Sequence, residues 1–219
     1  MGSLVSTIIS SARQRLNETG TAFFTDEQLT AFCNEAQKYF ARETKCLEAT
    51  DTSKTSVSGT QSYALPSDFY ALKRLLYDGK IVFETSFNDI DETEIDETDY
   101  TGTPESFYIW NNKIYFIPVP DTTGDIISVY YYKMPANISA TTDMLEINTL
   151  YDDTIIAYIV YLALIKDDEL DKADYHMQEC NAKIALIKRH LKENNLMRPP
   201  RFRFSRNLST REPMDKYYR

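Results

Sequence analysis

The sequence of 219 residues is poor in the residues from which catalytic and metal sites are usually built. Its six glycines stand apart from one another, so none of them belongs to a glycine-rich loop that binds phosphate. The three cysteines and two histidines show no zinc-ligand spacing, and the odd number of cysteines argues against a disulfide framework. A nucleophile elbow is also missing. We therefore expect a protein that is not an enzyme and that needs no cofactor.

Long hydrophobic runs are missing as well. The longest, residues 155–165, has 11 residues, whereas a helix that crosses a bilayer needs about 20. The first 16 residues contain neither the basic region nor the continuous apolar region of a secretory signal. We expect no membrane association.

Aromatic residues and acidic charge are in excess. Sixteen tyrosines and 11 phenylalanines suit β-strands and hydrated interfaces, which points to function on surfaces rather than in a pocket. The 24 basic and 33 acidic residues give a net charge of −9, which argues against general binding of nucleic acid by the whole chain. The charge is uneven, because residues 198–219 hold seven basic and two acidic residues. This segment carries +5, which leaves −14 for the rest.

Helical periodicity is found at both ends of the chain. Apolar residues at helical spacing predict a first helix over 4–16. A second helix begins after Thr25, which is predicted to form a capping box with Gln28. The apolar face of this helix continues to about Leu47.

Two further helices are expected near the end of the chain. The first of them is apolar all round over 155–165, which is typical of a buried central element or of a helix covered by a neighbouring subunit. Residues 170–191 carry a heptad seam, and we expect this helix to pack against the preceding one as an αα-hairpin. Tyr158, Tyr161 and Ile165 are our candidates for a subunit interface.

Between the two pairs of helices, the hydrophobic period changes from that of a helix to that of a strand. Asp78-Gly79 and Asn111-Asn112 each separate two β-rich runs and predict two-residue hairpins. Residues 125–134 form a further strand that is rich in tyrosine. About five strands with short turns predict a small antiparallel sandwich or open barrel.

The expected fold class is α+β, with a four-helix body from both chain ends, an inserted antiparallel β-sandwich or barrel domain, and an extended C-terminal tail. We assign residues 1–48 and 149–195 to the helical body, 49–148 to the inserted β domain and 196–219 to the basic tail. Two consecutive prolines near the start of the tail prevent the last helix from continuing.

A cluster of acidic residues lies between the two hairpins. Its members are Asp89, Asp91, Glu92, Glu94, Asp96, Glu97 and Asp99. A calcium-binding loop is one interpretation, but the glycine and the acid spacing of the EF-hand are missing, so we favour a solvated acidic loop. A metal shared by His176 and Cys180, one helical turn apart, is less favoured than an exposed histidine beside a core cysteine.

Cationic and aromatic residues alternate in the tail. The residues concerned are Arg198, Arg201, Phe202, Arg203, Phe204, Arg206, Arg211, Tyr217, Tyr218 and Arg219. Phenylalanines two residues apart lie on one face of a strand, so the tail suits docking in an extended conformation on an acidic protein groove. Stacking on single-stranded nucleic acid is a second interpretation, and a solvated end without a partner is a third.

Four short motifs resemble the head-to-tail adaptor (connector) proteins of short-tailed bacteriophages. They are Leu-Pro-Ser-Asp-Phe-Tyr at 65–70, Gly-Thr-Pro-Glu-Ser-Phe-Tyr at 102–108, Tyr-Phe-Ile-Pro-Val-Pro at 115–120 and Val-Tyr-Tyr-Tyr-Lys-Met-Pro at 129–135. The order of the expected elements is also similar, and the resemblance covers about residues 25–194.

The resemblance implies a structural protein of the virion neck that is assembled in the host cytoplasm. It implies a twelvefold ring beneath the portal that links the capsid to the tail and continues the DNA channel, with the basic tail as the portal-binding segment. The implied partners are the portal protein, a tail nozzle or tail-tube protein, further copies of the chain, and tail fibres as an additional candidate. Double-stranded DNA is expected to pass through without specific binding, because an acidic lumen repels it.

Three other functions stay open. The chain can be a single-stranded nucleic-acid-binding accessory protein that acts through the tail, with an affinity that falls steeply with salt. A hydrolase that uses the acidic loop is the second, and its metal-dependent activity would be lost on replacing Asp91 and Asp96. A cell-surface binding module formed by the β domain is least favoured, because the cysteine pattern gives it no support.

Overall fold

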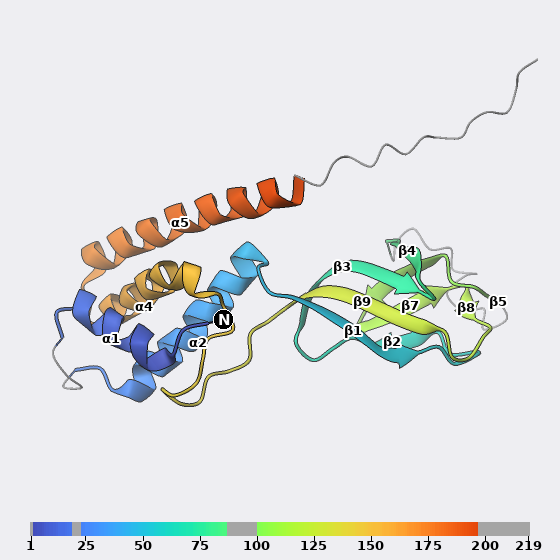
Figure 1. The fold of residues 1–219 in the computed structure, drawn as a ribbon, viewed down its shortest axis with the longest axis horizontal. Helices are drawn as coiled ribbons and strands as arrows, with labels where there is room; N and C mark the ends of the chain where they lie inside the picture. The colour runs from blue at the N-terminus through green and yellow to red at the C-terminus, as the bar shows by residue number, and fades with distance from the viewer. Residues whose placement is uncertain (1, 19–22, 87–99, 197–219) are drawn as a thin grey trace, which may run out of the picture.

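The computed structural model describes residues 2–18, 23–86 and 100–196. Helices and strands separate into two parts that are joined by two stretches of chain (Figure 1). In the described residues, the helical part consists of α1 (Val5–Arg15), α2 (Asp26–Thr44), the 3-10 helix η2 (Thr149–Tyr151), α4 (Asp152–Lys166) and α5 (Leu170–Leu196). The chain therefore has a mixed α+β fold.

The start of α2 confirms the expected capping box. The hydroxyl of Thr25 accepts a hydrogen bond from the backbone N–H of Gln28, and the side-chain oxygen of Gln28 accepts one from the backbone N–H of Thr25, both at 3.3 Å. The helix ends at Thr44, a few residues before the expected end, because Lys45 has a left-handed backbone conformation with φ of 52°. Such a residue commonly terminates a helix.

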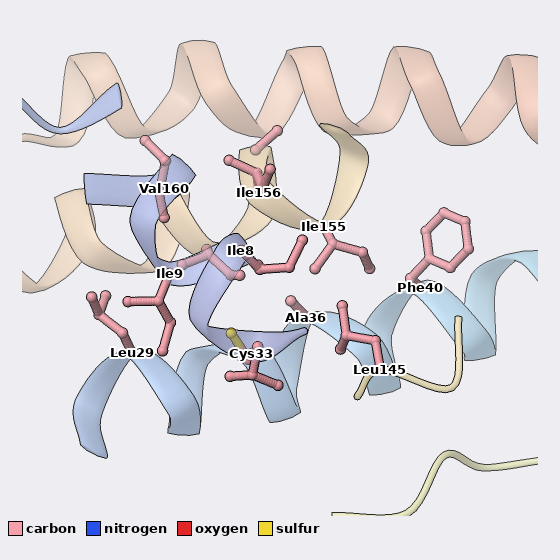
Figure 2. Packing of buried hydrophobic residues seen from close by; sticks show 14 of the residues in the cluster. Ile8, Ile9, Leu29, Cys33, Ala36, Phe40, Leu145, Ile155, Ile156 and Val160 are labelled. Atoms are coloured by element: carbon pink, nitrogen blue, oxygen red, sulfur yellow. The ribbon is translucent and has the colours of Figure 1, made fainter. Parts of the chain in front are cut away.

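The centre of the helical part is α4, which contacts α1, α2 and α5. Ile155 and Ile159 on its inner face are at most 1% exposed. In Figure 2, Ile8 and Ile9 of α1 lie between the labelled side chains of α2 and those of α4. The interpretation of 155–165 as a buried central helix is thus confirmed for this face.

The expected αα-hairpin is formed by α4 and α5, which pack along each other (Figure 1). Ala173, Cys180 and Ile184, all at positions of the heptad seam, are buried. Leu170, at the start of the seam, is exposed. The seam therefore serves contact within the chain over most of its length.

Residues 134–148 lead from the last strand to the helices and pack against them. Three side chains of this segment, Ile138, Leu145 and Ile147, are buried in the helical cluster. Asn34 of α2 donates from Nδ2 to the carbonyl oxygen of Ile138 (2.8 Å) and accepts at Oδ1 from the backbone N–H of Ile138 (2.7 Å). Gln37 donates to a second carbonyl oxygen of the segment (2.8 Å). Although the strand-like period of the sequence extends to these residues, they form no named strand and share the core of the helices.

Nine strands are described in the β part. They are β1 (Glu48–Thr55), β2 (Ser62–Ala64), β3 (Phe69–Tyr77), β4 (Lys80–Glu84), β5 (Thr101–Gly102), β6 (Ser106–Trp110), β7 (Lys113–Ile117), β8 (Val119–Pro120) and β9 (Ile126–Lys133). Seven of them make one sheet in the order β1-β9-β3-β4-β6-β7-β2, and β5 pairs with β8.

Both expected two-residue hairpins are confirmed. Asp78 and Gly79 connect β3 to β4 with φ of 46° and 74°, and Asn111 and Asn112 connect β6 to β7 with φ of 45° and 58°. Left-handed conformations at both turn positions suit the right-handed twist of the flanking strands. Asn, Asp and Gly are the residues that adopt them at low cost.

The seven-stranded sheet curls into a nearly closed barrel. The ring centroids of Tyr77 in β3 and Phe116 in β7 lie 5.5 Å apart, although two strands separate β3 from β7 in the sheet. In a flat sheet these strands would lie about 14 Å apart, at about 4.8 Å for each step. The inner side chains of the two ends of the sheet therefore share one core.

The sheet is not purely antiparallel, so the sequence expectation is wrong at two pairs of strands. β4 runs parallel to β6, and β5 runs parallel to β8. A parallel pair needs a long crossover connection, whereas a hairpin always gives an antiparallel pair. β4 ends at Glu84 and β6 begins at Ser106, so the sequence between them is long enough for such a crossover.

Candidate interaction surfaces

Most of the site residues expected from the sequence lie outside the described residues. This holds for the portal-binding tail at 198–219 and for the acidic loop at 89–99. The third expected group, Tyr158, Tyr161 and Ile165, lies on α4 and is described.

Two tyrosines of α4 and one of α2 form an aromatic cluster. The ring of Tyr158 stacks on that of Tyr39, with 4.4 Å between centroids and 13° between planes, and lies 5.4 Å from the ring of Tyr161. The hydroxyl of Tyr39 donates to Oδ1 of Asn181 on α5 at 3.0 Å. The cluster therefore ties α2, α4 and α5 together.

The outer face of α4 is not fully covered by its own chain. Tyr158 and Tyr161 are half-buried, and Ile165, one helical turn beyond Tyr161, is 41% exposed. We call the group of Tyr39, Tyr158, Tyr161 and Ile165 the tyrosine patch. The apolar character of this helix therefore has two causes, a core on one face and an uncovered patch on another.

Charged side chains of both signs lie close to the tyrosine patch, with Glu35 near Tyr158 and Arg42 near Tyr39. Burial raises the pKa of Tyr158, and the neighbouring tyrosines and the carboxylate of Glu35 raise it further. Burial is likewise the main cause of the raised pKa of Tyr39. Both phenols are therefore neutral at physiological pH. Glu35 and Arg42 are exposed, and neither has a hydrogen-bond or ion-pair partner in the described part of the chain.

A second surface, which the sequence reasoning missed, lies on the outer face of β9, β3 and β4. Arg74 and Tyr130 are cross-strand partners, as are Leu76 and Ile81. Phe83 lies on the same face of β4 as Ile81, because the residue between them points into the barrel. Tyr130, Ile81 and Phe83 are 36%, 45% and 62% exposed. We call Arg74, Leu76, Ile81, Phe83 and Tyr130 the sheet patch.

Two lysines lie next to Tyr132, which follows Tyr130 on the same face of β9. Nζ of Lys45 and Nζ of Lys73 lie 5.6 Å and 5.8 Å from the ring centroid of Tyr132, and Lys73 also pairs with Glu48 at 2.6 Å. Arg74 has no hydrogen-bond or ion-pair partner among the residues that the structure describes, and it lines a surface hollow together with Tyr130. In a chain of net charge −9, this face thus presents an unpaired guanidinium beside an exposed aromatic ring.

Over 2–18, 23–86 and 100–196, no group of three or more His, Cys, Asp or Glu side chains is placed to hold a metal ion. Nδ1 of His176 lies 3.3 Å from a carboxylate oxygen of Glu179, whereas the thiol of Cys180 points to a backbone carbonyl of α4 at 3.7 Å. Burial raises the pKa of Cys33 to about 12 and that of Cys180 to about 11, so both thiols are neutral at physiological pH.

Residues 3–203 match the model of the SU10 adaptor protein family. No curated protein matches the chain. In the described residues, no helix is long and apolar enough to cross a membrane. The family match begins before α1 and extends past the end of α5, so it includes both the helical part and the β part.

Proposed function

This chain belongs to the SU10 adaptor protein family, a family of phage head-tail adaptors, and we propose that it joins the capsid to the tail as a ring of copies beneath the portal. The family match carries this proposal, because it spans every described helix and strand rather than one motif. The two uncovered patches agree with a structural role.

Each part of the chain has its own task in this proposal. The four helices from both chain ends form the body of the ring, and the β part extends from it as a contact arm towards the tail nozzle or tail tube and the fibres. The ring is twelvefold, as the resemblance to connectors implies, and it continues the DNA channel in the virion neck. Residues 1–197 carry a net charge of −14, so they repel the DNA that passes through.

The basic tail is the proposed anchor on the portal protein. Residues 198–219 carry +5, and Phe202 and Phe204 are spaced to lie on one face of an extended segment. Such a segment suits an acidic groove with two apolar pockets. The family match extends to residue 203 and therefore includes the start of the tail.

The test is size-exclusion chromatography with light scattering, applied to the full chain and to a chain that ends at Leu196. Each is measured alone and with the portal protein of the same phage. We expect the full chain to join the portal as a ring and the shortened chain to fail. A full-length variant with Phe202→Ser and Phe204→Ser keeps the charge of +5 and serves as the matched control, since it separates apolar anchoring from attraction between charges.

A different result of the same experiment would contradict the proposal. If neither chain joins the portal, while the full chain retards single-stranded DNA and the shortened chain does not, the adaptor proposal is wrong. The tail is then a nucleic-acid-binding segment whose affinity falls steeply with salt.

A further inference from the structure

A ring of more than two copies needs two different contact surfaces on each copy. In a two-fold dimer one patch meets the same patch of its partner, whereas a ring joins one patch to a different patch on the next copy. The tyrosine patch can supply one of the two surfaces. The other has to be exposed, partly apolar and complementary in charge.

We propose that the tyrosine patch of one copy contacts the sheet patch of the next copy. This inference rests on the proposed ring and adds the two surfaces that form its contact. Both surfaces expose large apolar side chains, with Ile165 at 41% and Phe83 at 62%. Apolar residues that gather on a surface commonly mark interaction sites, and tyrosine and arginine are enriched at the centres of interfaces.

Each patch has a charged side chain that is complementary to one on the other patch. Glu35 lies near Tyr158 of the tyrosine patch, and Arg74 lies beside Tyr130 of the sheet patch. Neither charge has an ion-pair partner in the part of the chain that the structure describes, and a guanidinium with a carboxylate makes a strong paired hydrogen bond. The tyrosine patch also has a cation, Arg42 near Tyr39, so a contact between two tyrosine patches is not excluded by charge. A contact between two sheet patches would bring two guanidinium groups together. This like-charge contact is unfavourable, so the sheet patch needs a different surface on the next copy.

Nucleic acid is the other partner that an arginine beside an exposed tyrosine suits. Leu76, Ile81 and Phe83 favour a protein surface instead, because they extend the sheet patch with apolar area that phosphate groups do not cover. Binding of nucleic acid is therefore an outcome that the test has to distinguish.

The decisive experiment mixes two variants of the full chain, each with one damaged patch. Ile165→Glu damages the tyrosine patch and Phe83→Glu damages the sheet patch, and both sites are exposed enough to accept the change. Leu186→Glu, at a residue of α5 that is 60% exposed, is the matched control. Sedimentation velocity is measured up to about 1 mM, which covers weak contacts.

We expect the wild type and the Leu186→Glu chain to associate beyond dimers as the concentration rises, and each patch variant alone to stay monomeric. An equal mixture of the two patch variants should give a one-to-one dimer that does not grow, because each variant keeps one intact patch. A wild type that is monomeric at about 1 mM, a mixture that stays monomeric, or a patch variant that assembles like the wild type each overturns the inference.

Charge reversal tests the proposed ion pair. Glu35→Arg or Arg74→Glu alone should weaken self-association about two- to fivefold, and both changes in one chain should restore it. If Arg74→Glu instead leaves self-association unchanged and abolishes binding of single-stranded DNA, the sheet patch binds nucleic acid and the inference is wrong.

The inference and the proposed function fail in different ways. If the wild type joins the portal as a ring and both patch variants join equally well, the inference is wrong and the adaptor function stands. If the mixing pattern is observed but no chain joins the portal, the contact between copies is real and the adaptor function is wrong.

Discussion

The contact between α2 and residues 134–148 can be tested by removing the side-chain amide of Asn34. Asn34 makes two hydrogen bonds with the backbone of Ile138, at 2.8 Å and 2.7 Å, and Ile138 is 7% exposed. The substitution Asn34→Ala removes both bonds, and with them a third that Oδ1 accepts from Nε2 of Gln37 at 3.2 Å. It leaves a backbone N–H and a backbone carbonyl with little access to water. At about 0.5–1.5 kcal/mol for each of the three hydrogen bonds, the expected loss of unfolding free energy is about 1.5–4.5 kcal/mol.

The assay is urea unfolding followed by circular dichroism, together with amide hydrogen exchange at Ile138. We expect a lower midpoint with an unchanged slope, and faster exchange at this amide. Asn181→Ala is the matched control, because the amide of Asn181 accepts one exposed hydrogen bond from Tyr39, and its change should stay within about 0.5 kcal/mol. An Asn34→Ala loss no larger than that of the control would refute the reasoning.

Three further predictions concern titratable groups. Burial raises the pKa of Asp51, but hydrogen bonds from Lys54 and a neighbouring serine outweigh it and hold this pKa at about 2, below the usual 3.8. The stability that Asp51 adds is therefore present above pH 3.8 and is lost as the pH falls through about 2. Urea unfolding of Asp51→Asn should therefore show a smaller loss between these pH values than the wild type, and an equal loss contradicts the assignment. Burial and a hydrogen bond to the carboxylate of Asp68 raise the pKa of Tyr131 to about 12. The stability that Tyr131 adds is complete below pH 10 and is lost as the pH rises through about 12. Tyr131→Phe should therefore remove one tyrosine that ionises near pH 12 in an ultraviolet titration and cost about 1 kcal/mol of unfolding free energy at neutral pH. Cys33 and Cys180 should react with a thiol reagent only after unfolding, and rapid labelling of the native protein at either residue would show that its burial is wrong.

The features that the sequence predicts well are those that depend on residues close to one another in the chain. The capping box of Thr25 and Gln28 spans three positions, and each hairpin turn depends on two neighbouring residues that accept a left-handed conformation. The physical cause of each element lies within its own few residues. The apolar residues of α4 likewise indicate burial without any knowledge of the neighbouring helices.

The features that the sequence does not predict depend on distant partners. The bond between Asn34 and Ile138 joins residues 104 positions apart, and no local pattern marks either of them. The parallel pairing of β4 with β6 depends on the path of the crossover between them. Strand propensity identifies the strands but contains no information about their direction in the sheet.

Of the two candidate surfaces, one could be predicted from the sequence and the other could not. Tyr161 and Ile165 could be named from the sequence because a helix that is apolar on every side has more apolar surface than one core face needs. The sheet patch was missed because Ile81, Val82 and Phe83 form a continuous apolar run, which does not show which face is buried. The sequence did contain one signal for this patch, because a short strand with apolar residues on both faces has one apolar face that the core does not bury.

The path of the chain between the two parts has a consequence for how such proteins change over evolution. The β part is entered at Glu48 and left near Tyr132, which are cross-strand partners, and the backbone N–H of Lys133 donates to the carbonyl oxygen of Leu47 at 3.0 Å. The points at which the chain enters and leaves the β part are therefore adjacent, which allows one β unit to be exchanged for another. A different β unit, or a short turn, can be joined at these two points while the helices keep their own core. Lineages can thus exchange the β part, and the sheet patch with it, while they preserve the helical part.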